Sequence, residues 1–189
     1  LPSGSLYGSH ASFVAPSHLE AVDGKVPVEE SHVISPPNAL KLQWQSASGG
    51  DWRVSLEVRP GYAKEEWQGD SLNFWCYSET ELTPESSPRI ALQDSDHNGT
   101  PAILLIGDLH DIPAKKWVRV QLPFSSFVSP VKTTNDRTFD PGKMSRISIF
   151  QGLDDNQPHM LYIDEIAVEN ARADSVVPTT PEGRSAKGY

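Results

Sequence analysis

The chain has 189 residues, of which 37% are hydrophobic and 22% are charged, and its formal net charge at pH 7 is −9. This length and composition predict one folded domain with a sizeable core. The negative charge argues against nucleic acid or an anionic membrane surface as the main partner. No apolar run approaches the roughly 20 residues that a membrane-spanning helix needs, and the first residues lack the pattern of a signal peptide.

The single cysteine, Cys76, excludes an internal disulfide framework. It shares the apolar side of a predicted strand with Leu72 and Phe74. We therefore expect a buried, inert thiol rather than a nucleophile. Cysteine usage gives no information on the cellular compartment.

In chain order, short segments of alternating apolar and polar residues follow one another, separated by Gly, Pro, Asn and Asp turn signals. This period of two is typical of half-buried strands. The predicted strands lie within residues 26–33, 39–44, 51–59, 71–78, 89–93, 101–106, 117–123, 144–150 and 161–170. Asn98–Gly99 is a hairpin signal, and no segment has the pattern of an amphipathic helix. The sequence therefore predicts an all-β fold, an antiparallel β-sandwich.

The two ends of the chain differ in composition from the predicted strands. Residues 1–12 are rich in Ser and Gly, so we expect a flexible N-terminus there. Residues 13–171 form the predicted β-sandwich. Residues 172–189 have little periodicity and several Pro, Thr, Ser and Gly residues, which predicts a linker toward a further domain.

The last predicted strand contains a change of phase. Leu161 and Ile163 share one face of an extended strand, whereas Ile166 and Val168 fall on the opposite parity. A bulge at Asp164–Glu165 would keep all four apolar residues on one core. Its two adjacent carboxylates suit a hard cation, and the plainer alternative is a solvent-exposed acidic bulge.

Four segments occur in a fixed order along the chain: ALKLQW (39–44), SLNFWCYS (71–78), KKWVRVQLPFSSF (115–127) and MLYIDEIAVEN (160–170). Together they resemble the galactose-binding-like jelly rolls found among carbohydrate-binding modules. The resemblance covers most of residues 25–170. It implies a jelly-roll β-sandwich whose partner is a polysaccharide or oligosaccharide.

The same resemblance implies a structural calcium ion. In modules of this kind an acid on the final strand often holds calcium together with groups from the first strands, and Asp164 matches that position. The candidate partners in this chain are Glu20, Glu30, Ser35 and Asn38. Pro36 stands where such modules more usually have Gly, which counts against backbone ligation at that turn. The alternative remains a surface acid at a bulge.

The segment DSDHNG, residues 94–99, matches the first half of a calcium-binding loop. The twelfth position, however, is Leu105, where a bidentate Glu is needed. A polar hairpin turn accounts for the segment and is the favoured interpretation. Asp94, Asp96 and Asn98 remain candidates for a second cation site.

A sugar site needs flat aromatic rings and planar polar side chains. Trp75 and Tyr77 stand with Asn73 on the strand face opposite the apolar side of residues 71–78. The alternative is that Trp75 packs under the loop at residues 78–88. Four further polar strand residues are predicted to join this face: Arg53, Arg89, Gln93 and Gln151.

Catalytic motifs are not found: the sequence has no nucleophile elbow, phosphate loop, HExxH motif or paired cysteines. We therefore expect a non-catalytic, calcium-stabilised carbohydrate-binding module that targets an appended carbohydrate-active enzyme to a polysaccharide. The expected location is secreted, periplasmic or at the cell surface. The alternatives are a jelly-roll interaction or spacer domain without a sugar site and, less favoured, a small polysaccharide lyase or hydrolase.

Overall fold

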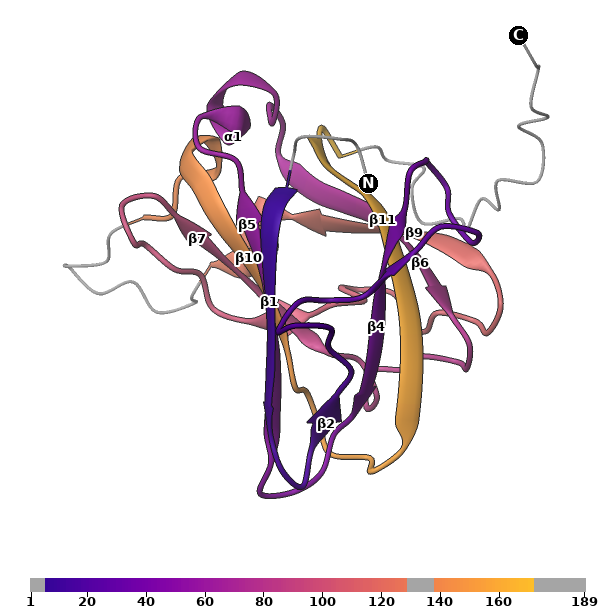
Figure 1. Cartoon of the computed structure of the whole chain (residues 1–189). Coiled ribbons are helices and arrows are strands. Elements are labelled where there is room, and N and C mark those ends of the chain that lie inside the picture. The colour runs from indigo at the N-terminus through magenta and orange to yellow at the C-terminus, as the bar shows by residue number, and fades with distance from the viewer. Residues whose placement is uncertain (1–5, 129–137, 172–189) are drawn as a thin grey trace, which may run out of the picture.

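The computed structural model describes residues 6–128 and 138–171, and Figure 1 shows two β-sheets stacked as layers. All strand pairings within the two sheets are antiparallel. The helical elements are one turn of α-helix, α1 (Tyr62–Glu65), and two 3-10 turns, η1 (Phe124–Phe127) and η2 (Pro141–Lys143). This architecture confirms the predicted all-β sandwich. Across the described ranges, every helix is too short to cross a membrane.

Sheet A contains five strands in the spatial order β1 (Leu6–Val14), β5 (Asp51–Val58), β10 (Met144–Phe150), β7 (Arg89–Asp94) and β8 (Ile103–Leu104). Sheet B has the order β2 (His18–Leu19), β4 (Ala39–Gln45), β11 (Pro158–Glu169), β6 (Ser71–Ser78) and β9 (Trp117–Pro123), and β3 (Val28–Glu29) also pairs with β4. Strands that are neighbours in a sheet are therefore mostly distant in the chain, as in Greek-key sandwiches.

The core forms because each long strand directs alternate apolar side chains into the space between the sheets. Val54 and Leu56 of β5 and Phe74 and Cys76 of β6 belong to this core, and all are at most 2% exposed. Burial raises the pKa of the Cys76 thiol far above its ordinary value, because the thiolate would lose its hydration. The prediction of an inert, buried thiol is confirmed.

The predicted bulge in β11 is confirmed. Asp164 lies opposite Trp75 and the next pair is Ala167 with Asn73, so three steps on β11 match two on β6. Glu165 takes up the extra residue with a φ of +49°. The alternative of a solvent-exposed acidic bulge is wrong for Asp164, which is 0% exposed.

The prediction of a flexible N-terminus over residues 1–12 is wrong for residues 6–12. They belong to β1, which pairs with β5 from Leu6 to Val14. The stretch is polar and rich in small residues because β1 is an edge strand, so its sequence lacks the alternation of the central strands. Residues 1–5 and the predicted linker at 172–189 lie outside the described residues.

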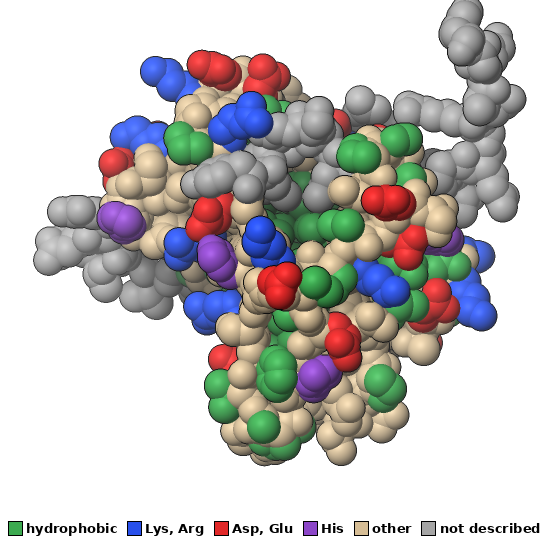
Figure 2. All heavy atoms as spheres, viewed as in Figure 1, with side chains coloured by type: hydrophobic (Ala, Val, Ile, Leu, Met, Phe, Trp, Pro, Cys, Tyr) green, Lys and Arg blue, Asp and Glu red, His purple; other side chains and the backbone are tan. Residues whose placement is uncertain are grey.

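The predicted hairpin at Asn98–Gly99 is confirmed, since β7 and β8 pair on either side of it. Figure 2 shows hydrophobic side chains interspersed with charged ones of both signs on the side of the molecule in view. Among the described residues, the exposed large apolar side chains come from separate segments except for the consecutive pair on β1: Phe13, Val14, Val22, Val28, Val128 and Leu153. Scattered apolar residues of this kind are normal on a folded domain.

Candidate glycan-binding surfaces

The predicted sugar-binding residues on strands belong to two different sheets; Asn73 among them is buried, at 2% exposed, and Gln151 lies beyond the end of β10. Asn73, Trp75 and Tyr77 lie on β6 in sheet B. Arg53 lies on β5, and Arg89 and Gln93 on β7, in sheet A. The prediction that these residues share one face is therefore wrong. Alternation along a strand shows which residues point outward, but it does not show which sheet the strand joins.

The outer face of sheet B carries an aromatic cluster, which we define as Tyr77, Trp117, Tyr162 and His32. The first three are in register on neighbouring strands. His32 comes from the segment between β3 and β4 and covers them, with ring centroids 4.1 Å from Tyr77, 5.1 Å from Tyr162 and 5.5 Å from Trp117. The imidazole is nearly parallel to the Trp117 ring, at 19°. Part of this aromatic face is thus covered by the chain itself.

Asp164 holds the covering segment in place. Its Oδ2 accepts hydrogen bonds from the backbone N–H groups of Ile34 at 2.8 Å and Ser35 at 2.9 Å. Its Oδ1 accepts from the N–H of Glu165 at 2.7 Å and from the Ser35 hydroxyl at 3.4 Å. The single buried carboxylate of Asp164 therefore accepts hydrogen bonds from the backbone of the β11 bulge and from the backbone of the segment that bears His32, and so holds that segment in place.

These contacts do not fit calcium at Asp164. A calcium ion needs oxygen lone pairs directed toward it, whereas the Asp164 oxygens already face N–H and O–H donors. The predicted ligand Glu20 lies elsewhere on sheet B: its backbone N–H donates to the Gln43 carbonyl oxygen on β4. Ile163, the neighbour of Asp164, instead pairs with Leu40, three residues away along β4. That offset places Glu20 roughly 10 Å further along the sheet.

Two more of the predicted calcium ligands, Glu30 and Asn38, flank the covering segment, and Glu30 is exposed. Among the described residues no group of three or more His, Cys, Asp or Glu is placed to hold a metal ion. The structural calcium ion stays an untested prediction, and the hydrogen bonds to Ile34, Ser35 and Glu165 are the alternative account of Asp164.

The DSDHNG segment forms a turn organised by Asp94, which is 1% exposed. Asp94 Oδ1 accepts from the N–H groups of Asp96 and Asn98, and Oδ2 accepts from the Asn98 amide and the N–H of Asp140. Desolvation raises the pKa of Asp94, but these hydrogen bonds together outweigh it and leave the pKa below its ordinary value. Asp96 instead pairs with Lys143, with 2.8 Å between the Lys143 Nζ and a carboxylate oxygen.

The outer face of sheet A is polar, and we define the polar face by nine outward residues in three rows. The middle row consists of Ser55, Ser148 and Ala91, in register on β5, β10 and β7. The rows on either side carry long side chains: Arg53, Phe150 and Arg89 on one, and Glu57, Arg146 and Gln93 on the other. The Arg53 guanidinium lies over the Phe150 ring, 5.1 Å from its centroid. Small side chains therefore lie between two rows of planar polar groups.

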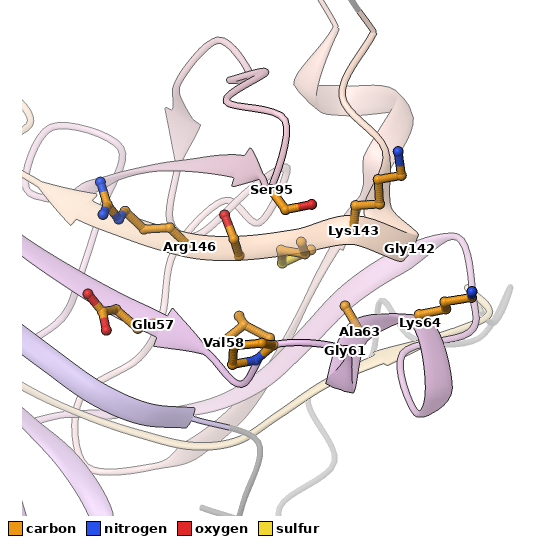
Figure 3. A pocket seen from close by; sticks show the side chains of 12 residues that line it. Glu57, Val58, Gly61, Ala63, Lys64, Ser95, Gly142, Lys143 and Arg146 are labelled. Atoms are coloured by element: carbon orange, nitrogen blue, oxygen red, sulfur yellow. The ribbon is translucent and has the colours of Figure 1, made fainter.

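A cavity of about 410 Å³, the end pocket, adjoins this face where β5 ends and β10 begins. Glu57 and Arg146 belong both to the polar face and to the wall of the cavity. Figure 3 shows these two side chains at one end of the pocket, and Lys64 and Lys143 at the other end. The end pocket therefore opens onto the polar face and runs toward α1 and η2.

The end pocket combines a carboxylate with cationic groups. Glu57 lies 3.6 Å from the His10 ring, measured from carboxylate oxygen to Nε2, and its side chain is 27% exposed. Lys143 donates to Asp96, and this hydrogen bond is the main cause that raises the pKa of Lys143. Arg146 has no ion-pair partner within the described ranges. Hydrogen-bond donors and an acceptor thus line the same cavity.

Gln151 is not part of the polar face. Its Oε1 accepts from the Ser17 hydroxyl at 2.6 Å, and its Nε2 lies 2.8 Å from Asp154 and 3.3 Å from the carbonyl oxygens of Ala47 and Gly50. The side chain therefore ties three loops together at the end of the sandwich. As a predicted sugar ligand, Gln151 has its amide occupied by these internal contacts.

Sequence reasoning missed Glu57, Arg146 and Lys64 as site residues. A signal for the first two was present, because Glu57 lies in the alternating strand β5 and Arg146 begins the alternating part of β10, after its irregularity at Ser145. Lys64 lies on α1, a single helical turn after Pro60–Gly61, and nothing local in the sequence directs it toward β10.

No protein-family model matches the chain. It is 26% identical to an exo β-1,2-glucooligosaccharide sophorohydrolase (non-reducing end) from Parabacteroides distasonis, over the whole chain but only 26% of that enzyme. The chain thus spans about a quarter of the curated relative that it matches. The crystal structure of a β-1,2-glucanase from the same organism is similar with a TM-score of 0.73 and 24% identity, over 89% of this chain and 24% of that one.

Two carbohydrate-binding modules of Clostridium thermocellum match over almost their whole length. The family 30 module of a cellulosomal cellulase has a TM-score of 0.63 at 14% identity, over 86% of this chain and 91% of the module. The family 11 module, solved with a β-1,3-1,4-mixed-linked tetrasaccharide, has a TM-score of 0.57 at 13% identity, over 87% of this chain and 96% of the module. The fold is therefore that of β-sandwich carbohydrate-binding modules, as the sequence resemblance predicted.

Proposed function

We propose that this chain is a non-catalytic glycan-binding module that holds an attached carbohydrate-active enzyme at a polysaccharide. The observation that carries the proposal is the polar face of sheet A, where three arginines, a glutamate and a glutamine surround a row of small residues. The fold supports it, because solved modules of this architecture are carbohydrate-binding modules. The chain's short match to a much longer glucan-degrading relative fits a module attached to an enzyme.

The chemistry of the polar face suits hydroxyl recognition. Guanidinium and amide groups are planar donors, and the carboxylate of Glu57 is an acceptor, so adjacent sugar hydroxyls have complementary partners. Phe150 supplies an apolar ring for the C–H side of a pyranose. The low middle row of Ser55 and Ser148 leaves room for a sugar between the two rows of long side chains.

Two glucan types are the first ligands to test, since they appear in the names of similar proteins: β-1,2-glucooligosaccharides and the β-1,3-1,4-mixed-linked tetrasaccharide. Binding would raise the local concentration of the attached enzyme at its polymer. We place such a protein outside the cytoplasm, in a secreted, periplasmic or cell-surface setting, where polysaccharides are met.

The outer face of sheet B is a second candidate surface. Trp75 is only half-buried and lies beside Arg119 and Asp164 in register, outside the ring contacts made by His32. It therefore retains an aromatic edge that a sugar can reach. The neighbouring Tyr77 is covered by His32, so this surface offers less open ring area than the sequence predicted.

Titration calorimetry with the two glucan types tests the proposal and separates the surfaces. We expect the double variant Arg53→Ala with Arg89→Ala to lower the affinity at least tenfold, which is about 1.4 kcal/mol. The matched control on sheet B, Trp75→Ala, should leave the affinity unchanged. A loss confined to Trp75→Ala would move the site to sheet B.

Two other results would overturn the proposal. Absence of binding across a broad glycan panel by the folded chain would favour an interaction or spacer domain. Release of reducing sugar from polysaccharide by the isolated chain would favour a lyase or hydrolase.

A further inference from the structure

We infer that the end pocket receives the terminal sugar unit of a glycan, so that the module recognises chain ends rather than the middle of a polymer. The inference rests on the proposed function and adds to it which part of the polysaccharide is bound. It is carried by the shape and lining of the cavity where β5 and β10 meet α1 and η2.

The end pocket is closed at one end by α1 and η2, which lie across the direction of β5 and β10. The helical turn α1 follows β5 and packs against both η2 and β10. A glycan that lies along β5 and β10 over Ser55 and Ser148 passes between Glu57 and Arg146 and then meets the wall that carries Lys64 and Lys143 (Figure 3). The wall stops the chain there, so the unit that enters is the last one.

The size of the cavity agrees with a small ligand. Its volume of about 410 Å³ lies at the lower end of the ~300–1,000 Å³ typical of small-molecule pockets. One or two sugar units are therefore a better match than a long segment of polymer.

The lining of the cavity suits one pyranose ring. Val58, Ala63 and Met144 lie beneath the cavity and are at most 3% exposed, so the apolar surface open to a ligand comes from the exposed Pro60 and the aliphatic stems of Lys64 and Arg146. Such a surface can pack against the C–H side of a sugar ring, which has no charge and few donors. The Ser95 hydroxyl and the charged groups at both ends then face the ring hydroxyls, whereas the Ser145 hydroxyl donates to the Gln93 carbonyl oxygen at 3.3 Å.

The charged groups of the pocket lack mutual partners. Arg146 and Lys64 form no ion pair with any residue of the described ranges, and Glu57 and Arg146 stay further apart than an ion pair although they are in register. The donors of Arg146 and Lys64 are therefore available to a ligand, whereas the Glu57 carboxylate also lies 3.6 Å from His10 Nε2. In a chain of net charge −9, two unpaired cations in one cavity mark it as a place for oxygen-rich groups.

The test compares a linear β-1,2-glucan with a cyclic β-1,2-glucan, which has the same linkage but no chain ends. Calorimetry should show that the linear glucan binds with one module per chain whatever its length, and that the cyclic glucan binds at least tenfold more weakly. Equal affinity for both, with a stoichiometry that grows with chain length, would overturn the inference while leaving the proposed function standing. Failure of both glucans, and of the mixed-linked tetrasaccharide, to bind would instead count against the proposed function.

A pair of matched variants locates the effect. Ser95 is exposed at the rim of the pocket, and Ser125 is an exposed serine on η1, outside the pocket. Ser95→Trp should fill the cavity and lower the affinity for the linear glucan at least tenfold. Ser125→Trp should leave it unchanged, and both variants should keep the unfolding midpoint of the parent. An unaltered affinity in Ser95→Trp would exclude the end pocket as the site.

Discussion

The two outer faces of the sandwich arise from the same alternation of residues but differ in what covers them. The polar face of sheet A presents Arg53, Arg89 and Arg146 outward, all exposed. On sheet B, by contrast, His32 is stacked on aromatic rings and the segment around it is anchored by Asp164. An outward-facing aromatic residue in a sandwich is therefore a binding site only where the chain itself leaves it open.

Each face also has its own buried carboxylate. Asp164 satisfies backbone N–H groups of the segment over sheet B, and Asp94 satisfies those of the turn beside the end pocket in sheet A. Both are at most 1% exposed. Each carboxylate accepts hydrogen bonds from backbone N–H groups in place of a backbone carbonyl. Removing it therefore tests how far the stability of each face depends on one side chain.

The largest effect is expected for Asp164→Ala. Loss of the carboxylate leaves the N–H groups of Ile34, Ser35 and Glu165 without an acceptor, so we expect the free energy of unfolding to fall by about 2–4 kcal/mol. Urea unfolding followed by tryptophan fluorescence measures this. Glu165→Asn is the control, because Asn tolerates a positive φ and should change the stability by less than about 0.5 kcal/mol. A change below about 1 kcal/mol in Asp164→Ala would show that the covering segment is held by other contacts.

A smaller effect is expected for His32→Ala, which removes the ring from the aromatic cluster. Its contacts with Tyr77, Trp117 and Tyr162 should be worth about 1–2 kcal/mol of stability. The exposed His110→Ala is the matched control and should be neutral. Glycan affinity in His32→Ala should equal that of the parent. A gain of binding would show that the outer face of sheet B contains a sugar-binding site that His32 blocks.

The third prediction concerns acid pH and sheet A. Because the folded-state pKa of Asp94 is lowered, its contribution to stability is present above the unfolded pKa, about 3.9, and is lost as the pH falls through the folded value. Parent and Asp94→Asn should therefore differ most at neutral pH and converge below about pH 4. Urea midpoints from pH 7 to pH 2.5 measure this. A difference that stays constant with pH would contradict the role given to the ionised carboxylate.

The smallest effect is expected for metal removal. If Asp164 acts through the hydrogen bonds described, a chelator should leave the unfolding midpoint of the parent unchanged, and added calcium should not raise it. Differential scanning calorimetry with and without chelator decides the question. A clear fall in the midpoint with chelator would establish calcium binding, and its persistence in Asp164→Ala would place the ion elsewhere.

Much of the fold could be predicted from the sequence, because burial imposes a period of two on each central strand. The bulge at Asp164–Glu165 was visible for the same reason, as a phase change between Ile163 and Ile166. β1 and the two-residue strand β2 were missed, since edge strands bury little and need not alternate.

The candidate site was less predictable than the fold. Which sheet a strand joins depends on long-range pairing, so nothing in the sequence separated Arg53 from Trp75. The cover over Tyr77 likewise depends on the path of residues 30–38, which local patterns do not determine.

The position of β11 has a consequence for how the domain is made. It is the last strand of the described chain, yet it lies between β4 and β6 in the middle of sheet B. While the chain is being synthesised, the edges of β4 and β6 that pair with β11 have no partner until Pro158–Glu169 has left the ribosome. Sheet B therefore closes only after β11 has been made, and a premature stop before β11 releases a chain in which β4 and β6 each keep one open, aggregation-prone edge.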